Sequence, residues 1–424
     1  MLFVLFSYIF NFPVLSQLFG MGSNFVIGFF LLIFAFLNNK YRAIAINLFN
    51  KKYILIIFSI LTIICLYSLV IPTILDTDDY SIIPNFISQY FTLSIGIFVF
   101  ALYIYKARVS KLPLDLIYIY FIQGCIQLVS LLFPSVNIVL NNFRTSGAVE
   151  IGQEGFYDGI RGLSISGQAF FGLGVGYALI FILILKYWSQ ITPQFKVLRF
   201  VIFSIILFGG LSAARVSLVG LIIGSIYKMS TYIYTKKSFQ NFRNRLFKFY
   251  SIILFLLVCA GLLVLVLISE YTNSGQFLVT PWRSFSNYSF EFLNEFVNSG
   301  RLSTTSTDIL FNRMYFPIES IQTKLIGDGK YAGIGTSYYM NTDAGYMRNI
   351  LYFGVIGIII LFIYQLSFFR WNDKRWNLFN ISMLICILVL HIKGEVLGYS
   401  TMVLSILILI LQYQHNFSSN LSDK

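Results

Sequence analysis

Long apolar segments alternate with short polar stretches along almost the whole chain. Windows of about 20 mainly apolar residues, long enough to cross a bilayer as a helix, recur about twelve times. The predicted spans are 2–20 (interrupted by Pro13), 22–38, 52–73, 88–105, 114–134, 168–187, 197–212, 214–234, 250–269, 345–368, 377–391 and 397–413. This pattern predicts an all-α polytopic membrane protein in which residues 1–424 form one integral membrane domain.

Every second polar stretch is rich in Lys and Arg. These stretches and the adjoining helix ends hold 20 of the 30 basic residues, whereas the remaining stretches hold 14 of the 17 acidic residues. The basic stretches lie near 39–52, 106–111, 186–199, 236–248 and 370–375. Because cytoplasmic loops carry such a basic excess, about twelve spans place both termini in the cytoplasm of a bacterium. The acidic stretches then face outward from its inner membrane.

The composition supports this class: 57% of the residues are hydrophobic, 11% are charged, and the mean hydropathy is +0.78. The net charge of +13 is spread over short inner loops, which favours contact with anionic lipid headgroups and not with nucleic acid. The cysteines stand in apolar segments without a CxxC pair, so they are interpreted as small hydrophobic residues. We predict no metal or other cofactor, and the first apolar stretch lacks the basic region of a cleavable signal peptide.

The outer polar stretches differ in length, and the one at residues 270–344 is by far the longest. It is too polar to span a membrane, yet it is rich in aromatic residues, which argues against a disordered linker. We expect a periplasmic or extracellular loop whose short amphipathic helices cover the bundle. One such helix is predicted over 307–324, with a kink at Pro317.

Several outer arginines are candidates for binding an anionic substrate. Arg215 stands between two spans with almost no loop, either as an interfacial arginine that extends toward water or as a fixed cation for a lipid-linked anion. Arg161 lies between glycines at a helix entrance, where a guanidinium and free N–H groups suit a phosphate, although a plain loop-to-helix entry is equally compatible. Arg301, Arg313 and Arg348 belong to the long loop and the start of the next span.

Acidic residues of the same region are candidates for proton transfer. Asp343 enters the span beside Arg348, as a helix cap or as a catalytic carboxylate, and Glu319 is the second choice. A further cluster, predicted either to line the same cavity or to form an interfacial Lys–Glu pair, contains His391, Lys393 and Glu395. The acidic run at 76–79 has the spacing of an Asp-x-Asp metal motif, but no complementary acidic cluster accompanies it.

With these residues placed, the chain resembles the O-antigen polymerase and O-antigen ligase family of bacterial polysaccharide assembly. The resemblance rests on the topology and on three local patterns. These are Ser212-Ala213-Ala214-Arg215 between two spans, the Gly-flanked entrance at Arg161, and a pattern within and after the long loop. The last pattern runs from Ser299-Gly300-Arg301 through Leu325-Ile326-Gly327-Asp328-Gly329 to Asp343-Ala344-Gly345-Tyr346 and Phe353-Gly354-Val355-Ile356-Gly357.

The resemblance implies a metal-independent, membrane-embedded glycosyltransferase of the C-type that uses no nucleotide sugar. Its substrates would be undecaprenyl-diphosphate-linked oligosaccharides, joined with inversion into O-antigen or capsule. The diphosphate would be stabilised by Arg161, Arg215 and Arg301, assisted by Arg313 and Arg348, while Asp343 or Glu319 takes the hydroxyl proton. Membrane lipids, a chain-length regulator and a flippase are the other expected partners.

Two alternatives stay open at this point. The first is the ligase of the same family, which transfers finished polymer; family ligases often carry His-Asn where this chain has Thr342-Asp343, which favours the polymerase. The second is a lipid-linked oligosaccharide flippase or other transporter. Transporters commonly carry charges near the bilayer midplane, whereas the ionisable residues here gather at the outer face.

Overall fold

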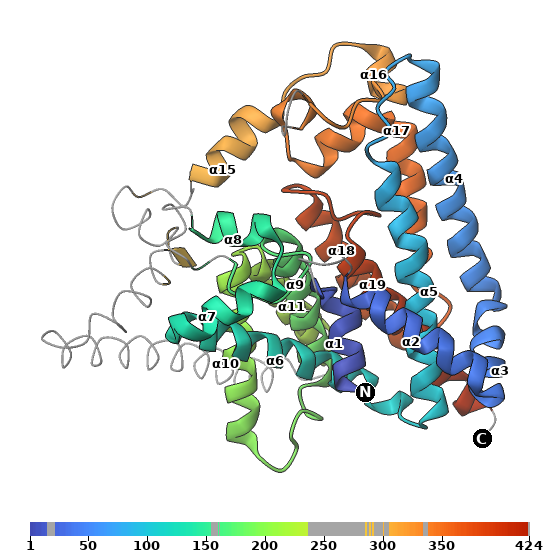
Figure 1. Cartoon of the computed structure of the whole chain (residues 1–424), viewed down its shortest axis with the longest axis vertical. Coiled ribbons are helices and arrows are strands. Elements are labelled where there is room, and N and C mark those ends of the chain that lie inside the picture. The colour runs from blue at the N-terminus through green and yellow to red at the C-terminus, as the bar shows by residue number, and fades with distance from the viewer. Residues whose placement is uncertain are drawn as a thin grey trace, which may run out of the picture.

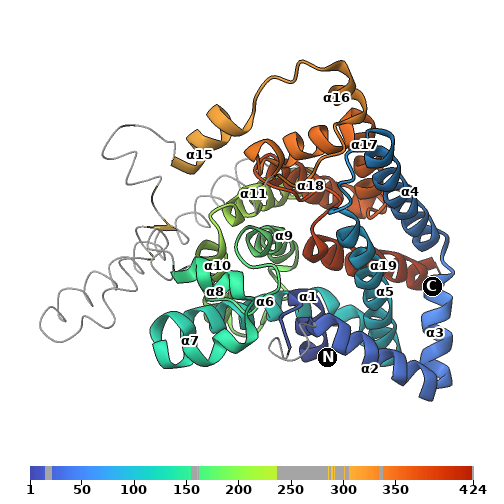
Figure 2. The same ribbon diagram turned by 45° about the horizontal axis from the view of Figure 1, so that its top comes forward.

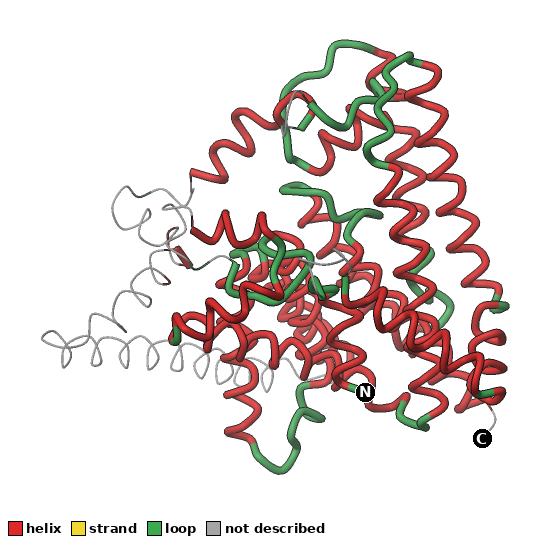
Figure 3. Tube along the Cα trace, in the orientation of Figure 1, coloured by secondary structure: helices red, strands yellow, loops and turns green. Residues whose placement is uncertain are grey.

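A computed structural model describes residues 1–14, 22–153, 160, 162–235, 285, 288–289, 291, 300, 305–333 and 338–422. Within these ranges every regular element is a helix, and the β-structure consists of isolated bridges (Figure 3). The predicted span 250–269 and the candidate residues Arg161 and Arg301 lie outside the described residues. The predicted all-α class is confirmed for the described part of the chain.

Five helical segments of the described chain are long and apolar enough to cross a membrane. They are α4 (Lys52–Ile74), α5 (Ile83–Tyr105), Val109–Leu132, which includes α6 (Leu112–Leu132), α10 (Lys196–Ala213) and α17 (Gly345–Leu366). A sixth candidate is the pair α2 (Ser23–Leu37) and α3 (Asn39–Phe49), bent by 116°. The other main helices are α1 (Leu2–Phe10), α9 (Phe171–Tyr187), α11 (Ser217–Thr235), α18 (Lys374–His391) and α19 (Thr401–Ser422). Five or six candidate spans are therefore present among the described residues.

Most helices coincide with predicted apolar segments, but two places differ. Helix α1 ends at Phe10, within the predicted span 2–20, and most of the stretch 39–52 is helical. This basic stretch, predicted as a cytoplasmic loop, forms helix α3. The side chain of Asn38 accepts a hydrogen bond from the backbone N–H of Tyr41 at 2.9 Å, so it caps the N-terminus of α3 where the chain turns away from α2. The cap at Asn38 therefore stabilises the start of a second helix, where the sequence predicts a polar loop.

The outward faces of several helices are apolar. On α4 the exposed side chains include Leu55, Ile63, Leu66 and Ile74, and on α17 they include Val355, Ile359 and Ile363. Exposed apolar surface of this extent is unfavourable in water but suits lipid. α4, α5 and the C-terminal part of α17 stand side by side at the right of Figure 1. These faces and the apolar spans indicate a membrane protein.

Helix α9 lies at the centre of the bundle, in contact with α6, α10, α11, α18 and α19 (Figure 2). Small residues allow its neighbours to approach closely: a Cβ at Gly220 of α11 would lie 2.0 Å from the carbonyl oxygen of Ala178. A Cβ at Gly174 would lie 2.7 Å from the Cβ of Ala214. This packing places the α10–α11 turn beside the start of α9.

The segment before α17 forms α15 (Thr305–Ile309), a π-helical turn (Leu310–Met314) and α16 (Ile321–Ile326). The predicted helix over 307–324 is wrong in its middle, because residues 315–320, which include Pro317, are not helical. The chain leaves α15 and runs to α16 at the top of Figure 1. The proline ends the helix instead of kinking it.

Helix α17 is interrupted at Gly354, where φ is +64°. The interruption frees the carbonyls of Leu351 and Tyr352, which accept hydrogen bonds from the N–H groups of Asp328 at 2.6 Å and Gly329 at 3.3 Å. A Cβ at Gly354 would meet the backbone of Leu325 at 2.3 Å. The glycine patterns at 325–329 and 353–357 thus pack against each other. This contact lies at the interruption between the N-terminal part of α17 and its apolar C-terminal part.

Candidate functional site

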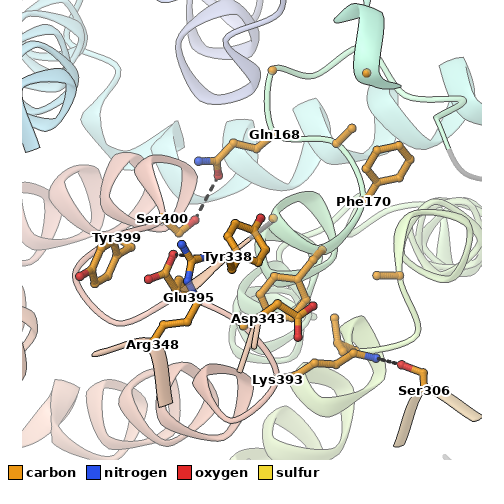
Figure 4. Close-up of a pocket in the computed structure, with 18 of the residues that line it drawn as sticks. Gln168, Phe170, Ser306, Tyr338, Asp343, Arg348, Lys393, Glu395, Tyr399 and Ser400 are labelled. Carbon is orange, nitrogen blue, oxygen red and sulfur yellow. Dashed lines mark hydrogen bonds and ion pairs between the residues drawn. The ribbon is translucent and has the colours of Figure 1, made fainter. Parts of the chain in front are cut away.

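A cavity of about 770 Å³ lies between the ends of several helices (Figure 4). Its walls come from the entrance to α9, the α10–α11 turn, the α18–α19 loop and the residues around the start of α17. The lining residues are Asn85, Thr145, Gly147, Gly167, Gln168, Ala169, Phe170, Phe171, Gly172, Ala214, Arg215, Val216, Tyr288, Ser306, Tyr338, Asp343, Arg348, Lys393, Gly394, Glu395, Tyr399 and Ser400. Five residues predicted to act at the site therefore share one cavity: Arg215, Asp343, Arg348, Lys393 and Glu395.

Arg348 is held rigidly in the first turn of α17. Its Nη1 lies 2.8 Å from Oε2 of Glu395, and its guanidinium carbon lies 4.0 Å from the ring centre of Tyr331 and 3.8 Å from that of Tyr338. The residue is only 7% exposed. Two aromatic rings and a carboxylate therefore fix the guanidinium in one orientation.

Glu395 is anchored from a second direction. The hydroxyl of Tyr331 donates a hydrogen bond to Oε2 of Glu395 at 2.6 Å. Burial raises the pKa of Glu395 above its ordinary value, although the charge of Arg348 and the hydroxyl of Tyr331 oppose the rise. Tyr331 was not singled out from the sequence, since it reaches this site only through the fold of the loop after α16.

Arg215 occupies the turn between α10 and α11. Its Nη1 lies 2.7 Å from Oε2 of Glu291, and its guanidinium carbon lies 5.3 Å from the ring centre of Tyr288. The turn is tied to α6 by Gln127, whose Nε2 donates to the carbonyl of Gly209 at 3.1 Å and to Oγ of Ser212 at 3.0 Å. A buried amide on α6 thus holds the loop that presents this arginine to the cavity.

Asp343 and Lys393 line the same part of the cavity. Nζ of Lys393 donates to Oγ of Ser306 at 3.0 Å, which joins α15 to the α18–α19 loop. Although Asp343 is open to the cavity, the surrounding protein removes part of its hydration and raises its pKa, against the charges of Lys393 and Arg348. A carboxylate beside cations in a polar cavity can accept a proton from a bound hydroxyl.

The entrance to α9 is strained. Phe170 precedes the helix with φ +61° and ψ −120°, a conformation that favours glycine. Nearby, Gln168 links two helices: Nε2 donates to Oγ1 of Thr401 at 2.8 Å, and Oε1 accepts from Oγ of Ser400 at 3.1 Å. Neither Phe170 nor Gln168 was a candidate from the sequence, because neither is charged.

Three predicted residues lie outside the cavity lining. Arg313 and Glu319 are exposed on the segment between α15 and α16. His391 is fully buried: Nδ1 accepts hydrogen bonds from the N–H groups of Val396 at 3.0 Å and Leu397 at 3.2 Å. The prediction that His391 lines the cavity is corrected accordingly, since this histidine organises the α18–α19 loop.

Arg144, an outer-loop arginine, is engaged within the protein. Its guanidinium donates to the carbonyls of Leu163 and Ser164, to Oγ of Ser130, and to the amide oxygens of Asn137 and Asn141. Burial lowers the pKa of Arg144 to about 10. This residue ties the segment after α6 to the stretch that leads into α9.

The acidic run at 76–79 contributes to packing. Oδ2 of Asp79 accepts hydrogen bonds from the N–H groups of Tyr331 at 2.6 Å and Ala332 at 2.8 Å, and Thr77 donates to the carbonyl of Gly329 at 2.9 Å. Among the described residues, no group of three or more His, Cys, Asp or Glu side chains could hold a metal ion. The run docks the α4–α5 connection onto the loop after α16.

Comparison of the chain with protein-family models, curated proteins and solved structures finds no match.

Proposed function

We propose that this protein polymerises undecaprenyl-diphosphate-linked oligosaccharide repeat units into O-antigen or capsular polysaccharide. The observation that carries the proposal is a single cavity, in a chain of apolar helices, that combines three cationic side chains with an exposed carboxylate. The cations are Arg215, Arg348 and Lys393, and the carboxylate is Asp343. A lipid-linked sugar diphosphate needs this combination of an apolar surround, positive charge and a proton acceptor.

The reaction proposed for the cavity is a single displacement at the anomeric carbon. A hydroxyl oxygen of the acceptor repeat unit forms the new bond to this carbon as the bond to the diphosphate oxygen breaks. Asp343 accepts the hydroxyl proton, and the electron pair of the broken bond leaves with undecaprenyl diphosphate. Attack opposite the leaving group inverts the configuration.

Charge accumulates on the departing diphosphate, and fixed cations stabilise that charge most effectively where water is excluded. Arg215 is suited to this role because Gln127 and the short turn hold its backbone in place. Lys393 stands on the opposite loop. Removing one preorganised donor of this kind typically slows a reaction by about 10²–10³-fold.

The same proposal specifies the membrane location and the topology of the protein. The cavity would open at the outer face of the bacterial cytoplasmic membrane, with about twelve spans in all and both termini in the cytoplasm. The apolar faces of the helices would contact membrane lipid and the polyprenyl chain. A flippase would supply the repeat units, and a chain-length regulator would set the polymer length.

The glycan profile of cells that lack the gene tests this proposal. Loss of long polymer, with single repeat units still exported and attached, is expected, and the wild-type gene should restore the polymer. Arg215→Ala and Asp343→Asn should fail to restore it at equal protein level. Arg375→Ala is the matched control, since Arg375 pairs with Asp373 at the start of α18 and is 52% exposed. Full-length polymer stranded on its carrier would indicate a ligase, and repeat units trapped inside would indicate a flippase.

A further inference from the structure

The loop between α18 and α19 forms one wall of the cavity, to which it supplies several lining residues. They are Lys393, Gly394, Glu395, Tyr399 and Ser400. The loop is held by His391, the last residue of α18, which is fully buried and lies outside the cavity lining. The shape of this wall therefore depends on a side chain that a ligand in the cavity does not touch.

Two backbone N–H groups of the loop bind one ring nitrogen of His391. Nδ1 accepts hydrogen bonds from Val396 at 3.0 Å and from Leu397 at 3.2 Å. Because a ring nitrogen accepts a hydrogen bond only when it carries no proton, the neutral imidazole has its proton on Nε2. The side-chain amide of Asn349 lies 2.8 Å from Nε2, and its oxygen offers the acceptor that this proton requires. A proton on Nδ1 would face both N–H groups, so this arrangement favours the neutral ring.

His391 joins the residues that follow the two members of the Arg348–Glu395 ion pair. Asn349 directly follows Arg348 in α17, and Val396 directly follows Glu395 in the α18–α19 loop. The imidazole bonds to both of these neighbours, one through each ring nitrogen. It therefore sets the distance between the two segments that carry the ion pair.

The first turn of α17 also packs directly on this imidazole. The ring of Tyr346 meets the ring of His391 edge-on, with 4.5 Å between the ring centres, and its hydroxyl donates to the carbonyl of Leu388 at 3.1 Å. A Cβ at Gly345 would lie 2.7 Å from Nδ1 of His391. The ring is thus enclosed on the side of α17 as well as on the side of the loop.

We propose that His391 is a positioning residue of the cavity, kept neutral with its proton on Nε2. By fixing the α18–α19 loop against the start of α17, it places Lys393 and Glu395 in the cavity wall. Its effect on the reaction rate rests on the proposed function, whereas its effect on the loop does not. His391 acts through these residues and contacts no substrate.

The protonation state of His391 is measured by nitrogen-15 NMR of the full-length protein in lipid nanodiscs. The chain has two histidines, so His415→Gln leaves His391 as the sole source of the imidazole signals. We expect a neutral ring with Nε2 protonated, unchanged between about pH 5.5 and about pH 8. A proton on Nδ1, donated to the carbonyl of Gly394, or an imidazolium at about pH 6 would overturn the assignment.

Two substitutions separate the hydrogen-bond acceptor from the bulk of the side chain. His391→Asn keeps an acceptor near the position of Nδ1, whereas His391→Leu leaves the N–H groups of Val396 and Leu397 buried without one. Hydrogen exchange over residues 392–400, followed by mass spectrometry in nanodiscs, should be about tenfold faster in His391→Leu than in the wild type. His391→Asn should exchange at close to the wild-type rate.

Elongation of lipid-linked repeat units tests positioning beyond stability. At a temperature where each variant is folded, His391→Leu should lower kcat by about tenfold, and His391→Asn should keep most of the rate. Because a displaced loop moves the Lys393 charge away from Asp343, the acid limb of the rate in His391→Leu should move to higher pH. His415→Gln is the matched control, since this histidine stacks on Tyr53 at 3.9 Å and lies outside the cavity lining. It should change neither the exchange nor the rate.

A wild-type kcat together with a wild-type acid limb in His391→Leu would overturn the positioning role, whatever the exchange shows. The proposed function fails separately. Absence of elongation by the wild-type protein, with the expected proton on Nε2 and the expected exchange pattern, would reject the polymerase and retain His391 as the residue that positions the loop.

Discussion

Nη1 of Arg348, in the first turn of α17, lies 2.8 Å from Oε2 of Glu395 in the loop between α18 and α19. The same carboxylate oxygen accepts the hydroxyl hydrogen of Tyr331, from the loop after α16. One carboxylate thus joins three segments that are distant in sequence. Because all three border the cavity or its wall, the ion pair couples the stability of this region to the geometry of the site.

Removing one member of this ion pair should destabilise the protein. Glu395→Ala leaves the Arg348 guanidinium buried without its counter-ion, which should lower the free energy of unfolding by about 3–5 kcal/mol. The double substitution Arg348→Met with Glu395→Leu removes both charges and should be less destabilising than Glu395→Ala. Unfolding of each variant in detergent measures these differences. Additive losses in the double variant would contradict the coupling.

The buried arginine of the outer loop should tolerate no substitution by lysine. Arg144→Lys keeps the charge but cannot reach the five acceptors around the guanidinium, so several buried oxygens lose their donors. We expect a loss of about 2–4 kcal/mol in unfolding free energy, measured by thermal unfolding and by proteolysis within 135–167. Arg375→Lys, at an exposed position, is the control. Equal stability of Arg144→Lys and wild type would show that these bonds contribute little.

The interruption of α17 gives a backbone prediction. Gly354→Ala introduces a Cβ at φ +64° and places it 2.3 Å from the backbone of Leu325, which should destabilise the protein by more than about 1 kcal/mol. Gly147→Ala is the matched control, because no atom lies within 4 Å of a Cβ at that position in α8 (Ser146–Gln153). A Gly354→Ala protein that unfolds at the wild-type temperature would argue against this contact.

The helix positions could be predicted because they follow from local hydropathy: α4, α5, α17 and α18 all lie where apolar residues are continuous. The grouping of Asp343, Arg348, Lys393 and Glu395 could be anticipated because these residues flank neighbouring helix ends. The partners that complete the site could not be anticipated, since Glu291, Tyr331 and Tyr399 reach it through tertiary packing. Helix α3 was not predicted because its N-cap, Asn38, was placed at the end of the span 22–38 and the basic residues after it favoured a loop.

The carboxylate proposed as the general base gives a pH prediction. Burial raises the pKa of Asp343, and the base acts when deprotonated, so the rate should fall as pH drops through a pKa above the ordinary range of an aspartate. The Lys393 charge lowers this pKa, and Lys393→Met should therefore move the acid limb to higher pH. Initial rates of polymer formation across pH measure the shift. An acid limb at the same pH in Lys393→Met and in the wild type would show that the charge of Lys393 does not affect the pKa of the base.

The charge of Arg215 gives a prediction about the chemical step. Arg215→Ala should reduce kcat by about 10²–10³-fold, because the cation is used most as the diphosphate departs. Arg215→Lys should retain part of the rate, since it keeps the charge but loses the planar fork that contacts Glu291. Single-turnover rates with lipid-linked repeat units compare the two variants. A change confined to KM would assign Arg215 to binding alone.

The most direct test of the central claim is elongation by the purified protein. Wild-type protein in nanodiscs would receive lipid-linked repeat units in the presence of EDTA and without nucleotide sugar, and the products would be resolved by length. We predict a ladder of polymers on undecaprenyl diphosphate with wild-type protein and none with Asp343→Asn. Unchanged single repeat units in the wild-type reaction would contradict polymerisation in this cavity.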